Sequence, residues 1–327
     1  MHSRHEVDNW LLRTPETIIM QPTSLCPLAC TYCYLPDRHV RQDMTTDIAE
    51  ATAAGIAEGW GVDRSIELVW HGGEPLAVGR DQFLRLIQVF EPLRLAGRVQ
   101  HMVQTSATMI THQWCDLFEC FDVKVGISVD GPRSTNRRRV DRAGHPAFDR
   151  AMAGVGILQQ RDFAFTILAV IGQESTDNAR SILDFLSDLG SPWVGLNIEA
   201  KEAANAGATV PTINDARRFW RDVLAWSTGE PPMKIREVEW LLNYLAADQS
   251  VRSSDARHDL IPTIGWNGDV VLLSPELLGV RDENYENFEH GKFSATETEH
   301  CRASFQAPVL ALADILEKGS QTDGYPG

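Results

Sequence analysis

The sequence predicts an α/β protein organised around a parallel β-sheet. Between residues 17 and 198, short apolar runs of β type alternate with stretches of helical periodicity. Strands that alternate with helices in this way are typical of right-handed βαβ units, whose neighbouring strands run parallel. The most distinctive polar motifs also follow directly after expected strands, as in folds whose sites lie at strand ends. Six units in about 185 residues fit either an open doubly wound sheet or a partial barrel.

The elements follow one another in a regular order. Six apolar runs are expected to be strands, and they are Thr17–Pro22, Ser65–Trp70, Val99–Thr105, Val123–Val129, Phe163–Ile171 and Trp193–Ile198. Helical spacing, in the first case within an Ala-rich stretch, predicts the intervening helices Thr45–Trp60, Asp81–Leu95, Thr111–Phe121, Phe148–Gln160 and Asn178–Leu189. Strand and helix therefore alternate through the first two-thirds of the chain.

The pattern changes near residue 201. Lys201–Val210 is rich in small residues and is expected to be a linker, which divides the chain into a domain at 16–200 and a C-terminal region at 211–327. In this second region, Asn267-Gly268 between apolar flanks is the strongest short-range signal for a β-hairpin. The other elements expected there are helices at 215–227, 235–248 and 309–318.

Composition and charge disfavour several classes of protein. A hydrophobic content of 43% and a charged content of 23% are those of an ordinary soluble globular protein. Apolar runs such as Ile167–Ile171 are too short to span a membrane, and the first twenty residues contain no secretory signal, so a cytoplasmic location is expected. The net charge of −15 argues against nucleic-acid binding. One loop departs from this acidic balance and is suited to an anionic group; it contains Arg133, Arg137, Arg138, Arg139 and Arg142.

Three of the six cysteines, Cys26, Cys30 and Cys33, fall within eight residues. Three thiolates on one short loop can hold three irons of a cubane [4Fe–4S] cluster and leave the fourth iron open to a substrate or cofactor. A disulfide framework is disfavoured, since it is typical of small secreted domains with paired cysteines. A zinc site is disfavoured because it usually needs a fourth ligand and Cys-x-x-Cys pairs, whereas the first spacing here is Cys-x-x-x-Cys.

Polar motifs follow the first four expected strands. In order, they are the cysteines, Gly72-Gly73-Glu74, Gln104-Thr105-Ser106 and Ser128-Val129-Asp130. Because parallel strands end at the same edge of a sheet, these motifs are expected on one face of the protein. Their types, order and spacing resemble the radical S-adenosylmethionine (SAM) superfamily, in the form found in anaerobic sulfatase maturases and peptide maturases. The resemblance covers residues 16–200 and implies a partial (β/α)6 barrel with one [4Fe–4S] cluster on the three cysteines and SAM on its open iron.

The resemblance also implies which residues contact SAM. They are Tyr32, Gly72, Gly73, Glu74, Gln104, Ser128, Asp130, Arg139 and Ile171. Gly72 and Gly73 allow the backbone to approach the SAM amino group closely, and Glu74 adds negative charge there. Tyr32 is expected to offer its backbone to the adenine. Arg139 resembles the arginine that pairs with the SAM carboxylate, with the two preceding arginines as alternatives.

Several of these residues have simpler interpretations. Glu74 fits a solvated turn residue, and Asp130 fits a turn former. Ser128, expected to bond the ribose hydroxyls, also fits an ordinary buried hydroxyl, while Ile171, expected against the adenine, fits the core. The third strand departs from the family, because residues 104–107 read Gln-Thr-Ser-Ala where relatives usually read Gln-Thr-Asn-Gly.

The chemistry implied is reductive cleavage of SAM, followed by hydrogen abstraction from a substrate by the 5′-deoxyadenosyl radical. The C-terminal region resembles a shortened SPASM domain, in which Cys301 is the only cysteine after Cys120 and an auxiliary cluster is therefore not expected. It is similar to a group of maturases that form cyclophanes, which implies a crosslink between an aromatic ring and a β-carbon of a ribosomally made precursor peptide. The expected partners are that peptide and an external one-electron donor such as flavodoxin or ferredoxin; nucleic acid and membranes are not.

Two other functions remain open. The first is oxidation of Ser or Cys to formylglycine in a sulfatase, although the full auxiliary-cluster domain expected for that activity is absent. The second, of a different class, is a non-catalytic Fe–S regulator or electron carrier. A protein of this class would not need the strand-end residues expected to contact SAM, such as Gly72-Gly73-Glu74 and Ser128. Cys115 and Cys120 lie on an expected helix and are expected to be core or neutral surface thiols.

Overall fold

The computed structural model of the protein describes residues 15–59, 65–201, 203–246 and 261–271, together with Pro275 and Leu278. Within these residues, nine strands form one sheet in the order β7-β6-β5-β4-β3-β2-β1-β8-β9. All neighbouring pairs are parallel except β8 and β9, which are antiparallel. Strands β1 to β6 lie side by side in sequence order, so each βαβ unit adds its strand next to the previous one.

The bounds of the elements are close to those predicted. The strands are β1 Thr17–Met20, β2 Ile66–Trp70, β3 Val99–Thr105, β4 Lys124–Ser128, β5 Phe165–Ile171, β6 Trp193–Ile198, β7 Lys234–Ile235, β8 Thr263–Ile264 and β9 Val270–Val271. The α-helices are α2 Thr46–Gly59, α3 Arg80–Val89, α4 Glu91–Leu95, α5 His112–Cys120, α6 Phe148–Gln160, α7 Ala179–Asp188, α8 Ile213–Trp226 and α9 Arg236–Ala246. Among the described residues there are also 3-10 turns, which sequence periodicity did not indicate: η1 Pro75–Val78, η2 Asn136–Arg138, η3 Gln173–Ser175 and η4 Ala203–Asn205.

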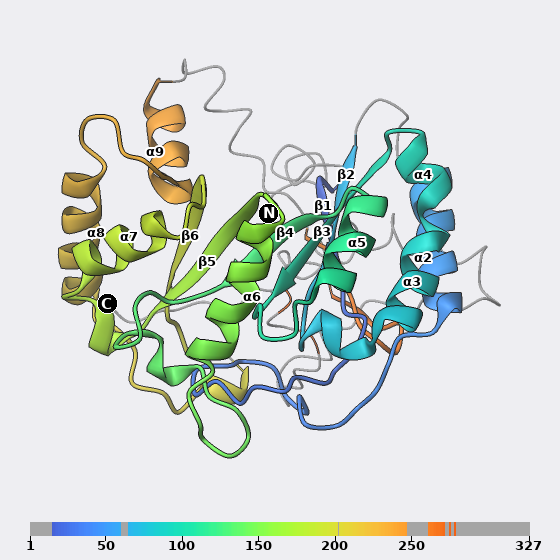
Figure 1. The fold of residues 1–327 in the computed structure, drawn as a ribbon, viewed down its shortest axis with the longest axis horizontal. Helices are drawn as coiled ribbons and strands as arrows, with labels where there is room; N and C mark the ends of the chain where they lie inside the picture. Colours follow the sequence, from blue (N-terminus) through green and yellow to red (C-terminus); the bar gives the residue numbers. More distant parts are fainter. Residues whose placement is uncertain are drawn as a thin grey trace, which may run out of the picture.

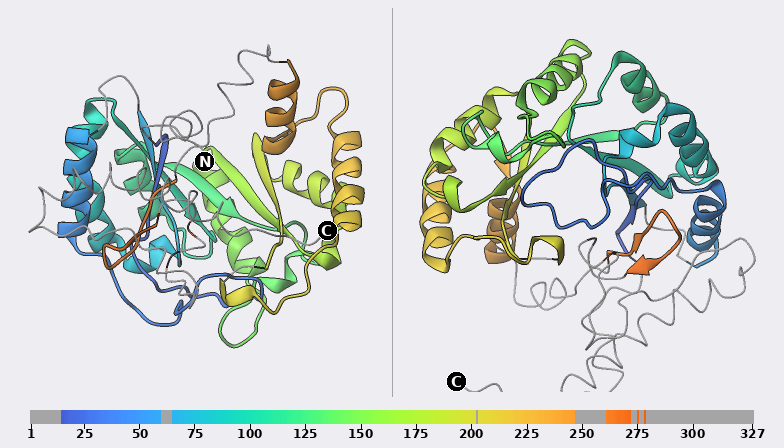
Figure 2. Two further views of the ribbon diagram at one scale, coloured as in Figure 1. Left: turned by 180° about the vertical axis from the view of Figure 1, so that it is seen from behind. Right: turned by 90° about the horizontal axis from the view of Figure 1, so that it is seen from below.

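The sheet curves into a partial barrel that does not close, with helices along its outer face (Figures 1 and 2). This confirms the predicted α/β class and, of the two architectures considered, the partial barrel. The burial of β5 follows from this arrangement. Phe165, Ile167, Ala169 and Ile171 are buried and belong to the same core as apolar residues of α6 and α7, whereas the residues between them are half-buried. Alternate side chains of the strand therefore face the helices and the open side of the sheet.

An aromatic cluster joins β2 and β3 to α3. The Trp70 ring centroid lies 5.2 Å from that of Phe83 and 5.9 Å from that of Phe90. Trp70 Nε1 donates a hydrogen bond of 3.3 Å to Nδ1 of His101, which is fully buried. Burial disfavours the charged imidazolium and lowers the pKa of His101 to about 4, so this histidine is a neutral member of the core at pH 7.

The second expected helix, Asp81–Leu95, is divided in the structure into α3 and α4. The break lies at Phe90, just before Pro92 in the first turn of α4. Proline has no N–H to donate to the preceding turn and is tolerated in the first turn of a helix, so a new helix begins there and the continuous helix was the wrong prediction.

The C-terminal region contributes strands to both edges of the sheet. Strand β7 pairs with β6, and β8 pairs with β1. The predicted hairpin is confirmed, but Ile264 pairs with Val270, so the loop around Asn267-Gly268 is longer than a two-residue turn. Cys301 and the helix expected at 309–318 lie outside the described residues. The division into domains at 16–200 and 211–327 stays a proposal.

None of the helices within the described ranges is both long and apolar enough to span a membrane.

Candidate functional site

The three clustered cysteines lie on the loop between β1 and α2. Cys30 is buried and packs with Leu28 and Ala147, and half-buried Cys26 and Cys33 pack against the same small cluster. The Cys33 amide donates to the Cys30 carbonyl oxygen at 3.1 Å, which closes a tight turn between the last two cysteines. The loop therefore gathers the three thiols, as the predicted cluster site requires.

The surroundings of the thiols favour a metal cluster over free thiolates. Burial, the charge of Glu74 and the other two cysteines all raise the pKa of Cys26, so cluster binding must displace a proton there. Across the described part of the chain, no three Cys, His, Asp or Glu side chains converge on a point where they would hold one metal ion.

The Gly-Gly pair at the end of β2 lies directly against the cysteine loop. Gly73 has φ 65°, and a Cβ added there would meet the carbonyl oxygens of Thr23 and Leu25 at 2.7 and 2.9 Å. The Glu74 amide then donates to the Leu25 carbonyl oxygen at 2.9 Å. Only glycine combines this left-handed backbone with so close an approach, so the backbone of the Gly-Gly segment fits beside the proposed cluster.

Glu74 differs from the solvated turn residue considered as an alternative, since it is only 1% exposed. Its carboxylate accepts hydrogen bonds from Thr105 Oγ1 (2.6 Å), the Ser106 amide (2.9 Å), Ser106 Oγ (2.5 Å) and the Leu76 amide (3.2 Å). These four donors occupy the carboxylate, which joins the end of β2 to the end of β3. Relatives usually carry Asn at the position of Ser106. In this chain the amide and the hydroxyl of Ser106 both donate hydrogen bonds to Glu74.

Gln104 and Ser128 meet on the open side of the sheet. Gln104 Nε2 donates to Ser128 Oγ at 2.9 Å, from neighbouring strands β3 and β4. Gly126 lies opposite Gln104 in the register, and any Cβ there would collide with the Gln104 amide. The glycine within β4 therefore makes room for a polar pair that faces the interior of the partial barrel.

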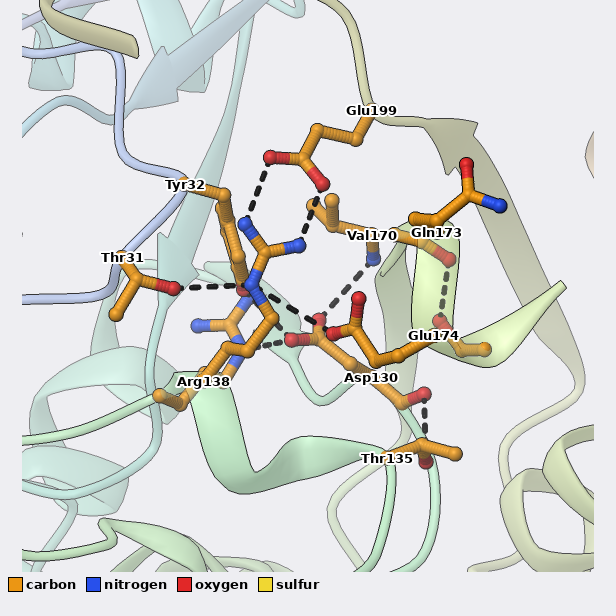
Figure 3. A network of polar contacts seen from close by, with 12 residues as sticks. Thr31, Tyr32, Asp130, Thr135, Arg138, Val170, Gln173, Glu174 and Glu199 are labelled. Atoms are coloured by element: carbon orange, nitrogen blue, oxygen red, sulfur yellow. Dashed lines mark hydrogen bonds and ion pairs between the residues drawn. The ribbon is translucent and has the colours of Figure 1, made fainter. Parts of the chain in front are cut away.

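Asp130, at the end of β4, is buried and holds three elements together (Figure 3). Its Oδ2 accepts a hydrogen bond of 2.7 Å from the Tyr32 hydroxyl, and its Oδ1 accepts one of 3.1 Å from the Val170 amide. Arg139 Nε lies 3.1 Å from Oδ2. Asp130 is therefore more than a turn former, since it links the cysteine loop to β5 and to the arginine loop.

Arg139 is the buried arginine of its loop. Burial lowers the pKa of its guanidinium, but the Asp130 carboxylate more than offsets this, so the pKa is raised and the side chain stays charged. Its Nε is not aligned for a hydrogen bond with any described residue, despite its closeness to Asp130. A buried arginine with an unpaired N–H in the loop after β4 suits a carboxylate ligand, as expected for SAM.

Arg138, by contrast, is fully occupied by protein groups (Figure 3). It forms two hydrogen bonds to the Glu199 carboxylate, at 2.5 and 2.7 Å, and its Nε donates to Thr31 Oγ1 at 2.9 Å. Its guanidinium carbon lies 5.1 Å from the centre of the Tyr32 ring. Arg137 is exposed, so Arg139 is the arginine of the three that the geometry favours for SAM.

Glu199 is a site residue that the sequence analysis did not identify. It follows β6 directly, as Asp130 follows β4, and is likewise buried. The strand-end rule that selected the other motifs was available for it, but its partner Arg138 is 61 residues away in the sequence. A single acidic residue after a strand is not a recognisable sequence motif, so Glu199 was not selected.

Ile171 is fully buried in the main core at the end of β5, the simpler of the two positions considered for it. Its neighbour Val170 is half-buried on the alternate face, which is the open side of the sheet. Adjacent strand residues point to opposite faces, so Val170, and not Ile171, faces the open side of the sheet.

The comparisons with known proteins agree with this geometry. The Radical SAM superfamily matches residues 20–199. An uncharacterized protein of Synechocystis is 32% identical over 333 residues, which cover 95% of this chain and 81% of that protein. The serine-type anaerobic sulfatase-maturating enzyme of Klebsiella aerogenes is 29% identical over 185 residues, or 55% of this chain and 46% of the enzyme, so this match spans less than half of that relative.

Two solved structures show the same fold at low sequence identity. The maturase anSMEcpe with bound AdoMet has a TM-score of 0.70 at 16% identity, over 89% of this chain and 82% of its own. SuiB of Streptococcus suis, bound to its precursor peptide SuiA, has a TM-score of 0.67 at 16% identity, over 93% of this chain and 67% of its own. With the extent of the family match, these results show that this chain belongs to the radical SAM superfamily, as an enzyme whose cofactors are a [4Fe–4S] cluster and SAM.

Proposed function

We propose that this enzyme modifies a ribosomally made precursor peptide by joining an aromatic ring to a β-carbon, to give a cyclophane. The observation that carries the proposal is that three cysteines pack in one small cluster on a single loop, at the same edge of the partial barrel as several polar groups of the strand ends. Structural likeness to SuiB, solved with its precursor peptide, supports a peptide substrate.

Different residues would hold the cluster and SAM. Cys26, Cys30 and Cys33 would hold the cluster, and the Gly72-Gly73 backbone would lie against the SAM amino group. When bound, the reduced cluster and SAM supply the 5′-deoxyadenosyl radical, which abstracts a hydrogen atom from the substrate. Arg139 would bind the SAM carboxylate.

The remaining polar residues would orient SAM and stiffen its surroundings. Gln104 and Ser128 would meet the ribose, and Tyr32 would lie near the adenine. Asp130 and Glu74 act mainly by fixing the ends of β4, β2 and β3, because their carboxylates are occupied by protein donors. Buried, fully bonded carboxylates of this kind keep a site rigid and help to exclude water.

The cyclophane product, specifically, is favoured by the C-terminal region. Only Cys301 follows Cys120 in the sequence, so the region lacks the thiols that an auxiliary cluster would need. A ring–carbon bond requires loss of one further electron and one proton, and we propose that the electron returns to the single cluster or leaves to an external acceptor. The one-electron donor would be a flavodoxin or ferredoxin, and the reduced cytoplasm would be the suitable compartment.

A second candidate is oxidation of a Ser or Cys side chain to formylglycine. The similarity to sulfatase-maturating enzymes of Klebsiella favours it, although that match covers less than half of those enzymes. Crosslinking and serine oxidation both remove two hydrogens, so the mass of the product alone does not distinguish them.

The test is coexpression with a precursor peptide encoded beside the enzyme, followed by tandem mass spectrometry. We expect a loss of two hydrogens that maps to an aromatic residue and a second residue joined to it, so that fragmentation between them is suppressed. A loss confined to one Ser, trapped by a hydrazine reagent, would support formylglycine formation instead. Cys30→Ala is expected to abolish either product, and Cys120→Ala, which removes an exposed thiol of α5, to have no effect.

The cofactor assignment has its own spectroscopic test. The anaerobically reconstituted protein is expected to change its electron paramagnetic resonance spectrum when SAM is added, because SAM occupies the open iron. An unchanged spectrum at saturating SAM would refute the assignment of SAM to the open iron.

A further inference from the structure

The loop between β4 and α6 is basic, although the chain as a whole is acidic. The net charge of the chain is −15, whereas residues 133–142 hold five arginines and one aspartate. Three of these arginines pair with Asp149, Glu199 and Asp130, which leaves Arg137 and Arg142 without a carboxylate partner in the described ranges. Arg138 and Arg139 point inward to Glu199 and Asp130, and the other three arginines are exposed. A patch of opposite sign to the rest of a protein orients an incoming charged partner, because it attracts what the remaining surface repels.

The acidic residues near this loop are already paired. Arg133 forms an ion pair with Asp149, and Arg150 forms one with Asp141. Arg137 is exposed and has no hydrogen bond or ion pair to any residue within the described ranges. Its positive charge is therefore not compensated locally and is available to a partner.

The basic loop lies directly on the cysteine loop. Backbone hydrogen bonds join the two loops on either side of Cys30, from the Ala29 amide to the Val140 carbonyl oxygen at 2.7 Å and from the Thr31 amide to the Arg138 carbonyl oxygen at 3.1 Å. A protein bound to the outer side of the basic loop would thus be separated from a cluster ligand by only one layer of backbone.

We infer that the exposed arginines of residues 133–142 form the docking surface for a small acidic protein that donates one electron to the cluster. The inference rests on the proposed function, since it names the face by which that function receives its electrons. The donor loses one electron and the cluster gains it, and no covalent bond forms or breaks in this step. Charge complementarity selects an acidic partner, because exposed arginines in an otherwise acidic chain attract and orient a negatively charged surface.

The placement of the loop favours an electron donor over the precursor peptide. The groups proposed to meet SAM, such as Gln104 and Ser128, lie on the open face of the sheet. The basic loop supplies the buried Arg139 to that site, but the loop itself projects away from the strands, beyond the segment that carries the cysteines (Figures 1 and 2). A peptide must reach the open face to be modified, whereas an electron needs only a short path to a cysteine.

The test measures binding of a purified flavodoxin to the reconstituted enzyme by isothermal titration calorimetry, at low and high ionic strength. Arg137→Glu is expected to weaken binding roughly fivefold, and Asp149→Asn, which frees Arg133 from its ion pair, to strengthen it about twofold. The matched control is Arg217→Glu, which makes the same charge change at an exposed position on α8. Arg142, which donates to the Cys26 carbonyl oxygen, is left unchanged because it touches the cysteine loop.

Activity measurements separate this inference from the proposed function. With dithionite as reductant, Arg137→Glu is expected to produce 5′-deoxyadenosine at the rate of the unmodified enzyme, while its flavodoxin-driven rate falls. Equal flavodoxin affinity of Arg137→Glu and Arg217→Glu would overturn the docking surface, as would a loss of affinity for the precursor peptide in place of the donor. If dithionite and SAM give no 5′-deoxyadenosine with the unmodified enzyme, the proposed function fails, whatever the binding data show.

Discussion

The buried ion pair between Arg138 and Glu199 gives the sharpest stability prediction. The side chains are 18% and 2% exposed, and the pair links the end of β6 to the arginine loop beside the cysteines. Replacing Glu199 by Gln keeps the shape but removes the carboxylate that Arg138 binds with two hydrogen bonds, so that only the more distant Glu174, 3.6 Å from Arg138 Nε, remains. Breaking a buried pair by removing one partner typically costs about 3–5 kcal/mol, and since Gln retains one acceptor we expect a loss of about 3 kcal/mol.

A matched pair on the surface provides the comparison. Arg133 and Asp149 make the same two-pronged contact, but their side chains are 61% and 73% exposed. Exposed pairs contribute about 0–1 kcal/mol, so Asp149→Asn is expected to change the free energy of unfolding by less than about 1 kcal/mol. The two substitutions change charge identically and differ in burial.

Urea denaturation of the cluster-free protein, followed by circular dichroism, measures both variants under the same conditions. A midpoint shift for Glu199→Gln several times that of Asp149→Asn, with similar slopes, is expected. A second variant, Glu199→Leu with Arg138→Met, is expected to recover much of the lost stability, because apolar residues tolerate burial that an unpaired charge does not. If Glu199→Gln and Asp149→Asn proved equally mild, burial would not be what makes the Arg138 pair important, and the reasoning would be refuted.

Three further predictions concern other positions. Gly126→Ala is expected to displace the Gln104 amide and weaken SAM binding several-fold in a titration, since the new Cβ has no free space. Asp162→Gly is expected to raise the free energy of unfolding by about 0.5 kcal/mol in a thermal melt, because Asp162 has φ 51° at the end of α6, where glycine is unstrained. The pKa of His101 is lowered to about 4 from 6.5 by burial, so its stabilising effect is complete above pH 6.5 and is lost as the pH falls toward 4, by about 3 kcal/mol, in urea titrations. His101→Leu should flatten this slope; an unchanged slope would exclude His101 as its cause.

The fold was largely predictable because its signals are local. Alternating apolar runs and helical stretches predict six βαβ strands in this order, and sequential strands are usually neighbours, as β1 to β6 are in the structure. The prediction of one helix at Asp81–Leu95 was wrong because the apolar periodicity continues past Pro92, whereas proline interrupts the helix. Strand β7, which has two residues, is too short for a periodic pattern to reveal.

The candidate site was predictable where a motif carries the chemistry, and it was missed where distant residues meet. The three cysteines form a recognisable spacing, but the bond from Tyr32 to Asp130 joins residues 98 apart, and neither residue alone indicates it. Ile171 shows a different limit, because selecting the lumen-facing residue of β5 requires the register, and a shift of one position exchanges the core for the open face.

Glu74 shows that the type of a residue at a strand end does not by itself tell whether its side chain contacts the cofactor. The acidic side chain was expected to offer its charge to SAM, yet four protein donors occupy its oxygens. Its charge still reaches the cysteine loop and raises the pKa of Cys26. Ser106 explains how this chain manages without the usual Asn, because its hydroxyl and amide both bind the same carboxylate oxygen. A strand-end acid can thus support a cofactor by fixing the backbone around it, and sequence motifs alone do not distinguish that role from direct contact.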